Sequence, residues 1–253
     1  MNGQSVILET AQSRGRVMVD ELAKALRVSD HTVRRDINAL CAQGKLRRLH
    51  SGAEFIEGNS NLPYSARTSL NVAAKQRIAA HVAGLIPDGA TLFFSIGTTP
   101  AVVAAALAER DGLTVITNNL NAAMALSETP GARIVIPGGE LRLPDRDVPG
   151  SLAQELFASY RANFAIYSAA GIDTDGSLLD FHAPEVRIRR QAQENARQSI
   201  FVADSSKFGR RAPAVGGHLD EAGHVVTEAK PGAPFATLLE SLGDRLIIAG
   251  EDT

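Results

Sequence analysis

The spacing of apolar residues near the N-terminus predicts three short helices. The first begins at Val6 and ends at Gly15, and Asp20 opens the second. Ser29 is a suitable N-cap for the third helix, because its hydroxyl can accept a hydrogen bond from a backbone N–H group of the first turn. Behind this cap, apolar residues recur at spacings of four and three: Val33, Ile37 and Leu40. This narrow stripe predicts that one face of the third helix packs on a core.

The polar side of the third helix carries side chains that can reach phosphates or base edges in a DNA major groove. Gly44 closes this helix, and residues 45–50 then predict a short hairpin. An amphipathic helix with arginine on its solvent side most often does not bind nucleic acid. Here a short helix, a turn, a capped helix and a basic ribbon follow in the order of a winged helix-turn-helix, which predicts binding to double-stranded DNA. The candidate contact residues are Ser29, His31, Thr32, Arg34, Arg35, Asn38, Arg47, Arg48 and His50.

Strand-like and helix-like runs alternate through the rest of the chain. TLFFSI precedes AVVAAALAER, LTVIT precedes LNAAMALSE, and further strand-like runs follow at RIVIPGG, FAIYSAA and SIFVAD. Alternation of this kind is typical of an α/β domain with a mostly parallel sheet, here a Rossmann-like one. In such sheets ligands bind beyond the carboxyl ends of the strands, so the residues just after each run are the candidates for a site.

Four loops that follow these runs carry residues suited to a phosphorylated polyol. Residues 97–100 (GTTP) place a glycine, two hydroxyls and a proline at a helix start, where backbone N–H groups and the helix dipole favour an anion. Taken alone, this loop could also be a capped helix without a ligand. In a parallel sheet it would converge with the other loops, so that Lys207 helps to hold a phosphate while amides and carboxylates bind hydroxyls. The other loops are Asn118–Asn119, 138–140 (GGE) and 204–207 (DSSK).

Two further segments are less specific. Residues 171–177 (GIDTDGS) predict a tight turn, which is either a plain surface loop or, through Asp173, part of the site. Pro184 opens a helix that is rich in arginine. We interpret its arginines as a solvated face: Arg187, Arg189, Arg190 and Arg197.

The distribution of charge and of turn-forming residues indicates two domains. Residues 1–53 carry nine Lys and Arg against five Asp and Glu, whereas residues 54–253 carry 17 against 23. A basic N-terminal part on an acidic body suggests that the N-terminal part meets a polyanion. Residues 58–63 (GNSNLP) are small, polar and helix-breaking. We therefore expect a DNA-binding domain over 1–57, a linker over 58–74 and an effector-binding domain over 75–253.

Composition excludes several other classes of protein. The chain has 253 residues, of which 44% are apolar and 21% charged, as in ordinary globular proteins. No apolar run approaches the roughly 18 residues that span a bilayer, so we expect a cytoplasmic protein with no membrane partner. The single Cys41 and the six scattered histidines predict no metal site. Motifs for dinucleotides, nucleoside triphosphates, esterases and zinc proteases are absent, so no cofactor is expected.

The N-terminal segments resemble a known family. VMVDELAKAL and VSDHTVRRDINALCAQGKLRRLHSGA are similar to the N-terminal region of the DeoR family of bacterial transcriptional regulators. Ser51 stands where that family usually has glycine, and a positive φ there would strain serine. Five residues match the family's recognition segment: Ser29, Thr32, Arg34, Arg35 and Asp36.

The resemblance continues over nearly the whole chain. SIGTTP, TNNLN, PGGE, GIDTDGSLLDF, PEVRIRRQAQENAR and ADSSKFG resemble the sensor domain of the family, in particular its glycerol-3-phosphate repressor subgroup. That domain is similar to ribose-phosphate isomerases and related sugar-phosphate binders. Ser95 stands where the family commonly has Asp, and Arg67, Asn71 and Lys75 match polar connector positions that we interpret first as packing. The resemblance implies an effector pocket of Gly97, Thr98, Thr99, Asn118, Gly139, Asp173, Glu185 and Lys207, to which we add the adjoining Ser95 and Asn119.

Two functions of different class fit these residues. The first is a repressor that docks its third helix on an operator, as a homodimer or homotetramer, and is released by a small phosphorylated metabolite such as glycerol 3-phosphate. Release requires that the effector bind the DNA-free arrangement more tightly. The alternative is a sugar-phosphate isomerase that uses Glu185 or Asp204 as base and Lys207 to polarise a carbonyl. An isomerase has no need of a DNA-binding domain, so the repressor, with no catalytic residue, is favoured.

Overall fold

The chain divides into two compact units. A computed structural model describes residues 3–14, 16–43, 45–49, 51–55 and 64–250. The first unit takes in the chain to residue 60 together with residues 69–71, and the second takes in residues 61–68 and everything from residue 72. Each unit buries a hydrophobic core of its own.

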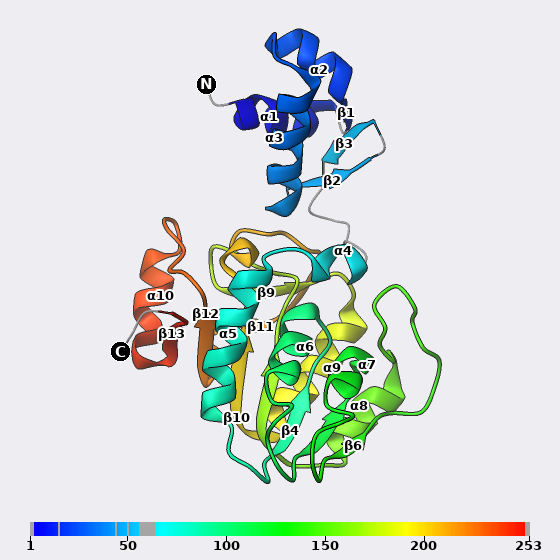
Figure 1. Cartoon of the computed structure of the whole chain (residues 1–253). Helices are drawn as coiled ribbons and strands as arrows, with labels where there is room; N and C mark the ends of the chain where they lie inside the picture. The colour runs from blue at the N-terminus through cyan, green and yellow to red at the C-terminus, as the bar shows by residue number, and fades with distance from the viewer. Residues whose placement is uncertain (1–2, 15, 44, 50, 56–63, 251–253) are drawn as a thin grey trace. The chain divides into compact units, whose positions relative to one another are not determined.

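The first unit packs three helices against a small antiparallel sheet (Figure 1). The sheet has the order β1-β3-β2, so that β3 pairs with a strand on either side. Ile7, Leu40 and Leu46 lie in the core that the helices and the sheet share. The elements are α1 (Gly3–Arg14), β1 (Arg16–Met18), α2 (Val19–Leu26), α3 (Asp30–Ala42), β2 (Leu46–Arg48) and β3 (Gly52–Phe55).

The apolar stripe expected for the third helix is confirmed in α3. Val33, Ile37 and Leu40 are buried, and Ser29 is the N-cap, because its Oγ accepts a hydrogen bond from the Thr32 N–H at 3.2 Å. The hairpin expected within residues 45–50 differs from the one observed. There β2 pairs with β3, and β1 adds a strand that the apolar pattern did not predict. The helices and the ribbon together have the winged helix-turn-helix arrangement.

At the turn of this ribbon, one of two neighbouring positions requires glycine. A Cβ atom on Gly52 would lie 2.0 Å from the Val17 carbonyl oxygen, so no side chain fits there. Ser51 is exposed, and its hydroxyl lies 3.9 Å from the Met18 sulfur. The strain that a positive φ would cause for serine at this position stays a prediction.

The second unit is built on a sheet of seven strands. All strand pairs in it are parallel, and the order is β13-β12-β10-β7-β4-β5-β6. The expected α/β class with a mostly parallel sheet is confirmed. The strands are β4 (Thr91–Phe94), β5 (Thr114–Thr117), β6 (Arg133–Val135), β7 (Ala162–Tyr167), β10 (Ala196–Val202), β12 (His224–Thr227) and β13 (Leu246–Ile248).

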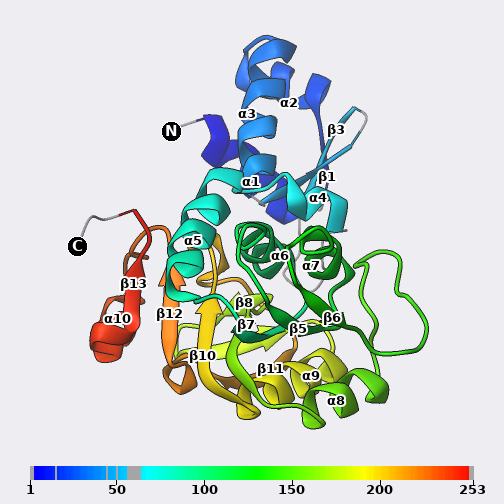
Figure 2. The ribbon, with the colours of Figure 1, turned by 60° about the horizontal axis from the view of Figure 1, so that its bottom comes forward.

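Helices cover both faces of this sheet (Figure 2). Along β4, Leu92 and Phe94 belong to the core on one face, whereas Phe93 packs edge-on against Phe157 on the other, with ring centroids 5.1 Å apart. A strand buried on both faces appears in the sequence as a continuous apolar run, as TLFF does. The first face carries α5 (Val72–Leu85), α6 (Thr98–Ala105) and α7 (Leu120–Ala125), and the second carries α8 (Ser151–Ala158) and α9 (Ala183–Glu194).

Smaller elements complete the second unit. Residues 58–63 of the expected linker lie outside the described residues, and the rest of it forms α4 (Tyr64–Thr68), a bend and the start of α5. None of the described helices is long and apolar enough to cross a membrane. The remaining elements are a small antiparallel sheet of β8 (Gly171–Ile172), β9 (Ser177–Asp180) and β11 (Ala214–His218), and the helix α10 (Ala236–Leu242).

The direction of the chain across the large sheet reverses between β4 and β7. From β4 the chain moves outward to β5 and β6, and it returns to the other side at β7 before continuing to β10, β12 and β13. The carboxyl ends of β4 and β7 therefore flank a topological switch point. Open α/β sheets bind their ligands at such points.

Candidate functional site

The solvent side of α3 carries most of the residues expected to contact DNA. His31, Arg34, Arg35 and Asn38 are exposed, on the side away from the buried stripe. The Arg48 guanidinium of β2 donates a hydrogen bond from Nη1 to Asn38 Oδ1 at 2.9 Å, so the ribbon and the helix are joined there. This surface therefore combines exposed cations with hydrogen-bonding groups on a helix that its own core holds in place.

Two of the expected contact residues have a structural role at the start of α3. The hydroxyls of Ser29 and Thr32 lie 3.0 Å apart, and the Ser29 hydroxyl also caps the helix. Their side chains fix the first turn of α3. The side chain of Arg47, and all of His50, lie outside the described residues.

A pocket opens in the second unit at the topological switch point. Its walls come from the chain that leaves β4 and β7, from the first turns of α6 and α9, and from α4. Ser168–Ala170, which follow β7, lie beside the Gly97 loop, because β7 and β4 are neighbours in the sheet. Six of the expected effector residues line this pocket: Ser95, Gly97, Thr98, Thr99, Glu185 and Lys207.

The Gly97 loop presents a helix N-terminus to the pocket. Gly97 has a φ of 127°, which L side chains rarely adopt, and a Cβ atom there would lie 3.2 Å from Pro100 Cδ. Thr98 and Thr99 follow as the first residues of α6, and both are buried in the pocket wall. Their backbone N–H groups have no acceptor within the helix, and the helix dipole adds partial positive charge. This end of α6 is suited to an anion.

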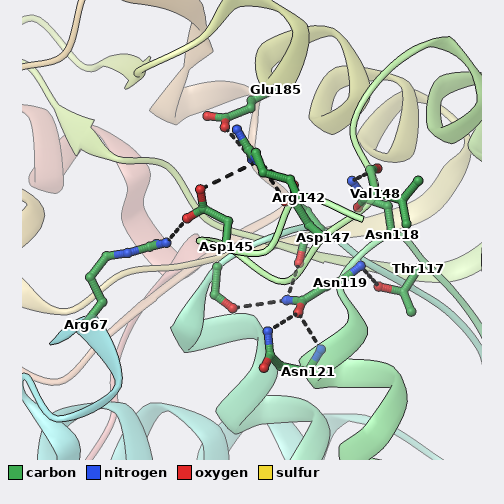
Figure 3. A network of polar contacts seen from close by, with 12 residues as sticks. Arg67, Thr117, Asn118, Asn119, Asn121, Arg142, Asp145, Asp147, Val148 and Glu185 are labelled. Atoms are coloured by element: carbon green, nitrogen blue, oxygen red, sulfur yellow. Dashed lines mark hydrogen bonds and ion pairs between the residues drawn. The ribbon is translucent and has the colours of Figure 1, made fainter. Parts of the chain in front are cut away.

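Two expected asparagines do not line the pocket, and one of them, Asn119, supports this loop. Asn119 Nδ2 donates to the carbonyl oxygens of Ser95 at 3.1 Å and Gly97 at 3.0 Å. Asn119 Oδ1 caps α7 by accepting a hydrogen bond from the Asn121 N–H at 3.1 Å, and Asn118 Nδ2 donates to the Val148 carbonyl at 3.2 Å (Figure 3). The backbone of the anion-binding end is thereby tied to the next strand and helix.

Two basic side chains converge on one carbonyl group beside the pocket. Lys207 Nζ lies 3.5 Å and Arg210 Nη1 lies 3.1 Å from the Ala170 oxygen, which both contact as donors. A single carbonyl oxygen carries only a partial negative charge. The two cations are therefore held together without a full counter-charge at that point.

The electrostatics around Lys207 reflect this crowding of positive charge. Burial, followed by the charge of Arg210, lowers the pKa of Lys207 to about 7, and Arg67 and Lys75 act in the same direction. Asp204 opposes them. Burial also lowers the pKa of Arg67, Lys75 and Arg210. An anion bound here would favour the charged form of all four groups.

Another part of the pocket wall carries acidic residues and one buried arginine. Burial raises the pKa of Glu185, although its contact with Arg142, at 2.7 Å, opposes that shift. Arg189 is only 2% exposed, and its Nε donates to Asp180 Oδ2 at 3.1 Å. Arg189 Nη1 is buried without a hydrogen-bond partner among the described residues. The interpretation of Arg189 as part of a solvated face is therefore wrong.

Besides the two asparagines, two further expected effector residues are not among those that line the pocket. Gly139 is exposed on the loop after β6. Asp173 forms the expected tight turn, in which its Oδ1 accepts from the Thr174 N–H at 2.7 Å and its own N–H donates to the Ser177 carbonyl at 2.9 Å. Their part in effector binding stays a prediction.

Four charged pocket residues were not among the expected ones: Arg67, Asp145, Asp180 and Arg189. Arg67 matched a polar position of the family connector, which was the one available signal. Asp145 pairs with Arg67 across 78 positions of sequence, and no local pattern reveals such a partner. Asp180 and Arg189 pair between β9 and α9, where burial of the arginine depends on a strand that precedes the helix.

Both units match models of known domains. Residues 4–59 match the DeoR-like helix-turn-helix domain, and residues 70–229 match the DeoR C terminal sensor domain. The chain belongs to the DeoR family. The resemblance found in the sequence is thereby confirmed over both units.

Individual DeoR-family relatives extend over most of the chain. The glycerol-3-phosphate regulon repressor of Escherichia coli (strain K12) is 41% identical over 89% of this chain and 89% of that protein. The repressor of the same name in Haemophilus influenzae is 40% identical over 89% and 88%. The HTH-type transcriptional repressor CsqR of Escherichia coli is 34% identical over 97% and 94%. These names support a DeoR-family regulator of transcription over the isomerase alternative.

Solved structures give a weaker likeness to the sensor unit. Ribose 5-phosphate isomerase A of Methanocaldococcus jannaschii is 16% identical, with a TM-score of 0.38, over 55% of this chain and 55% of that one. A likeness of this size carries no argument about what the DeoR-family chain does.

Proposed function

We propose that this chain represses a carbohydrate or glycerol catabolic operon and leaves its operator when a small phosphorylated metabolite fills the pocket. Glycerol 3-phosphate is the first candidate effector, because the relatives at 41% and 40% identity are named for the glycerol-3-phosphate regulon. The observation that carries the proposal is the meeting of a helix N-terminus with a cluster of partly buried basic side chains at one pocket. That combination suits a phosphate group.

On the DNA side, α3 would lie in the major groove. Arg34 and Arg35 are exposed on one side of α3, where they can reach phosphates or base edges. Arg48, joined to Asn38, would bring the ribbon to the flanking backbone. One copy of α3 spans few base pairs, so we expect a homodimer or homotetramer on a repeated or palindromic operator.

On the effector side, the phosphate would sit at the first turn of α6. The N–H groups of Thr98 and Thr99 would donate to its oxygens, and the ammonium of Lys207 would balance its charge. The hydroxyls of the carbon chain would face Glu185 and Arg189 across the pocket. Ser95 offers a hydroxyl where the family commonly has a carboxylate, and a neutral group does not repel the phosphate.

The effector must bind the free repressor and the operator-bound repressor with different affinities. An effector that bound the free and the operator-bound protein equally would shift nothing, however tight its binding. A typical coupling free energy is about 1–3 kcal/mol. Repression that is relieved by effector therefore requires a pocket whose contacts change between the states.

A thermal-shift panel on the full-length protein tests the effector assignment. Glycerol 3-phosphate, ribose 5-phosphate, glucose 6-phosphate, glycerol and inorganic phosphate are compared at equal concentration. We expect one phosphorylated metabolite to raise the melting temperature, since a ligand at about 100 times its Kd stabilises the folded state by about 2.7 kcal/mol. Lys207→Met should reduce the shift, whereas Arg187→Met, at an exposed position of α9, should leave it unchanged. A panel in which no phosphorylated compound shifts the wild-type protein contradicts the proposal.

A further inference from the structure

Helix α4 is attached to the loop between β6 and α8 by three contacts. The Tyr64 N–H donates to the Pro144 carbonyl at 3.1 Å, and the Arg146 guanidinium lies 5.8 Å from the centre of the Tyr64 ring. Arg67 forms an ion pair with Asp145, toward which its side chain points in Figure 3. Residues 141–147 of this loop therefore hold the helix in place, and Arg67 supplies the charged contact.

The ion pair of Arg67 is one step in a row of alternating charges. Asp145 also faces Arg142, with its Oδ2 3.6 Å from Arg142 Nε, and Arg142 in turn contacts Glu185 at 2.7 Å and Asp147 at 2.8 Å (Figure 3). Burial acts to lower the pKa of Arg142, but its hydrogen bonds with Asp147 and Glu185 raise it. Arg142 therefore has two strong carboxylate partners besides Asp145, whereas Asp145 divides one carboxylate between two arginines.

This row runs along the wall of the pocket. Arg67, Asp145 and Glu185 all line it, together with Lys207 and the first turn of α6. The positive charge of Arg67 also contributes to the lowered pKa of Lys207, so the two cations share one electrostatic neighbourhood. A phosphate dianion at this place offers Arg67 more charge and a bidentate partner, which a shared carboxylate does not.

Helix α4, which carries Arg67, is also connected along the chain to the DNA-binding unit. The chain on both sides of α4, up to residue 60 and again at residues 69–71, belongs to the DNA-binding unit. Lys75 Nζ donates to the Arg67 carbonyl at 2.6 Å, which ties the last turn of α4 to α5. The backbone therefore joins α4 on both sides to the unit that carries α3.

We propose that Arg67 binds the anionic group of the effector and that this exchange of partners, from Asp145 to the effector, loosens α4 from residues 141–147. The inference rests on the proposed function. It adds the residue through which effector binding in the pocket changes the DNA-binding unit. The differential binding that release requires comes from this exchange, because the Arg67–Asp145 pair is present in one state and absent in the other.

The test uses full-length protein and a duplex selected by the wild-type protein from a random-sequence library. Affinity for glycerol 3-phosphate, ribose 5-phosphate and glucose 6-phosphate is measured by calorimetry, and operator affinity by fluorescence anisotropy with and without saturating ligand. In the wild-type protein the ligand should weaken operator binding by roughly 5- to 150-fold. The same two measurements are made on Arg67→Gln, Arg67→Lys, Asp145→Asn and the control Arg77→Gln, an exposed arginine of α5.

The variants should separate binding from coupling. Arg67→Gln should bind the ligand roughly 10- to 150-fold more weakly, because a charge-assisted hydrogen bond is lost. Because it also lacks the ion pair with Asp145, its operator affinity without ligand should be lower than that of the wild type, and saturating ligand should lower it further by a smaller factor than in the wild type. Arg67→Lys keeps the charge and should recover part of the ligand affinity. Asp145→Asn removes the competing carboxylate, so it should bind the ligand more tightly and the operator more weakly even without ligand. Arg77→Gln should behave as the wild type.

Two failures are distinguishable. If the wild-type protein binds none of the three phosphorylated compounds, the proposed function fails and this inference fails with it. If the wild-type protein binds one of them, and folded Arg67→Gln and Arg67→Lys bind it as tightly and are released from the operator by the same factor, only the inference about Arg67 is overturned. Unchanged operator affinity in Asp145→Asn would likewise overturn it.

Discussion

The two units of the molecule present their polar side chains in opposite ways. In the DNA-binding unit, Arg34 and Arg35 are exposed on a helix that is held by its buried stripe. In the sensor unit, Lys207, Arg67 and Glu185 are withdrawn into a pocket wall, and burial shifts the pKa of each. Exposed cations act over a distance and are screened by salt. Buried ones act only on what enters the pocket.

This contrast teaches that the two binding events respond to different perturbations. Binding of DNA to an exposed cationic surface releases counterions, so its affinity depends strongly on ionic strength. Binding in a desolvated pocket depends instead on backbone geometry and on protonation.

The largest difference between the two units should be in the salt dependence of ligand affinity. Operator affinity should fall by roughly 10³- to 10⁵-fold between 50 and 200 mM salt if about 6–10 phosphates are contacted by the oligomer. Effector affinity, measured by calorimetry over the same range, should change far less, because one buried phosphate is involved. A flat salt response of operator binding would contradict the interface proposed on α3.

Arg35→Ala should weaken operator binding by about 1–3 kcal/mol per protomer, since it removes a base or phosphate contact. Arg35 is exposed, so the melting temperature should stay close to that of the wild type. The effector-induced thermal shift should also remain. Electrophoretic mobility shift and thermal denaturation measure the two properties in parallel, and loss of both would make Arg35 a structural residue.

Gly97→Ala should impair the sensor unit alone. The φ of 127° at this position is strained for any L side chain, and an added Cβ atom would press on Pro100. A cost of about 1–3 kcal/mol is expected for such a conformation, and the first turn of α6 should shift with it. Effector affinity should fall at least several-fold in calorimetry while basal operator affinity stays as it was. Wild-type effector affinity in this variant would argue against the anion site at α6.

Effector binding should also depend on pH through Lys207. The pKa of this residue is lowered to about 7 from an ordinary value of 10.5, so the neutral amine dominates in the free protein above that pH. A bound phosphate favours the ammonium form, and binding above pH 7 therefore takes up a proton. Effector affinity should fall as the pH rises above about 7, by up to about tenfold per pH unit. Lys207→Met should remove this dependence, and its persistence in that variant would exclude Lys207 as the titrating group.

The smallest effect is expected at the turn of the ribbon. Ser51→Gly should change the free energy of unfolding by no more than about 0.5 kcal/mol, because Ser51 is exposed and most substitutions of exposed residues stay within that range. The adjacent Gly52→Ala should be strongly destabilising, since its Cβ atom would collide with the Val17 carbonyl. Urea denaturation of the pair measures this difference. A large gain in stability from Ser51→Gly would show that serine strains this turn.

The sequence predicted best those elements that have a periodic or local pattern of residues. The apolar stripe of α3, the cap at Ser29 and the alternation of strands and helices were all predicted, because each pattern depends on residues that are close together in the sequence. The strand β1 was missed, because three residues carry too little pattern to be recognised. The partner of β2 was also missed, since the pairing of short strands depends on a turn rather than on composition.

The pocket was predicted in part, for a different physical reason. Thr98 and Thr99 follow a strand and begin a helix, so the rule for parallel sheets was sufficient to find them. Asn119 was found in the same way, but its amide is used to hold the Gly97 loop, which only the three-dimensional arrangement reveals. Arg67 and Asp145 meet across a long stretch of chain, and their pairing leaves no local signature.

In the proposed function, binding of the operator lowers the affinity for the effector, and binding of the effector lowers the affinity for the operator. The most direct measurement is the effector affinity of the free protein and of the same protein saturated with operator duplex, at equal salt. Thermodynamic linkage requires that the operator weaken effector binding by the same factor by which the effector weakens operator binding, here roughly 5- to 150-fold. Equal effector affinity in the free and the operator-bound protein would contradict the account.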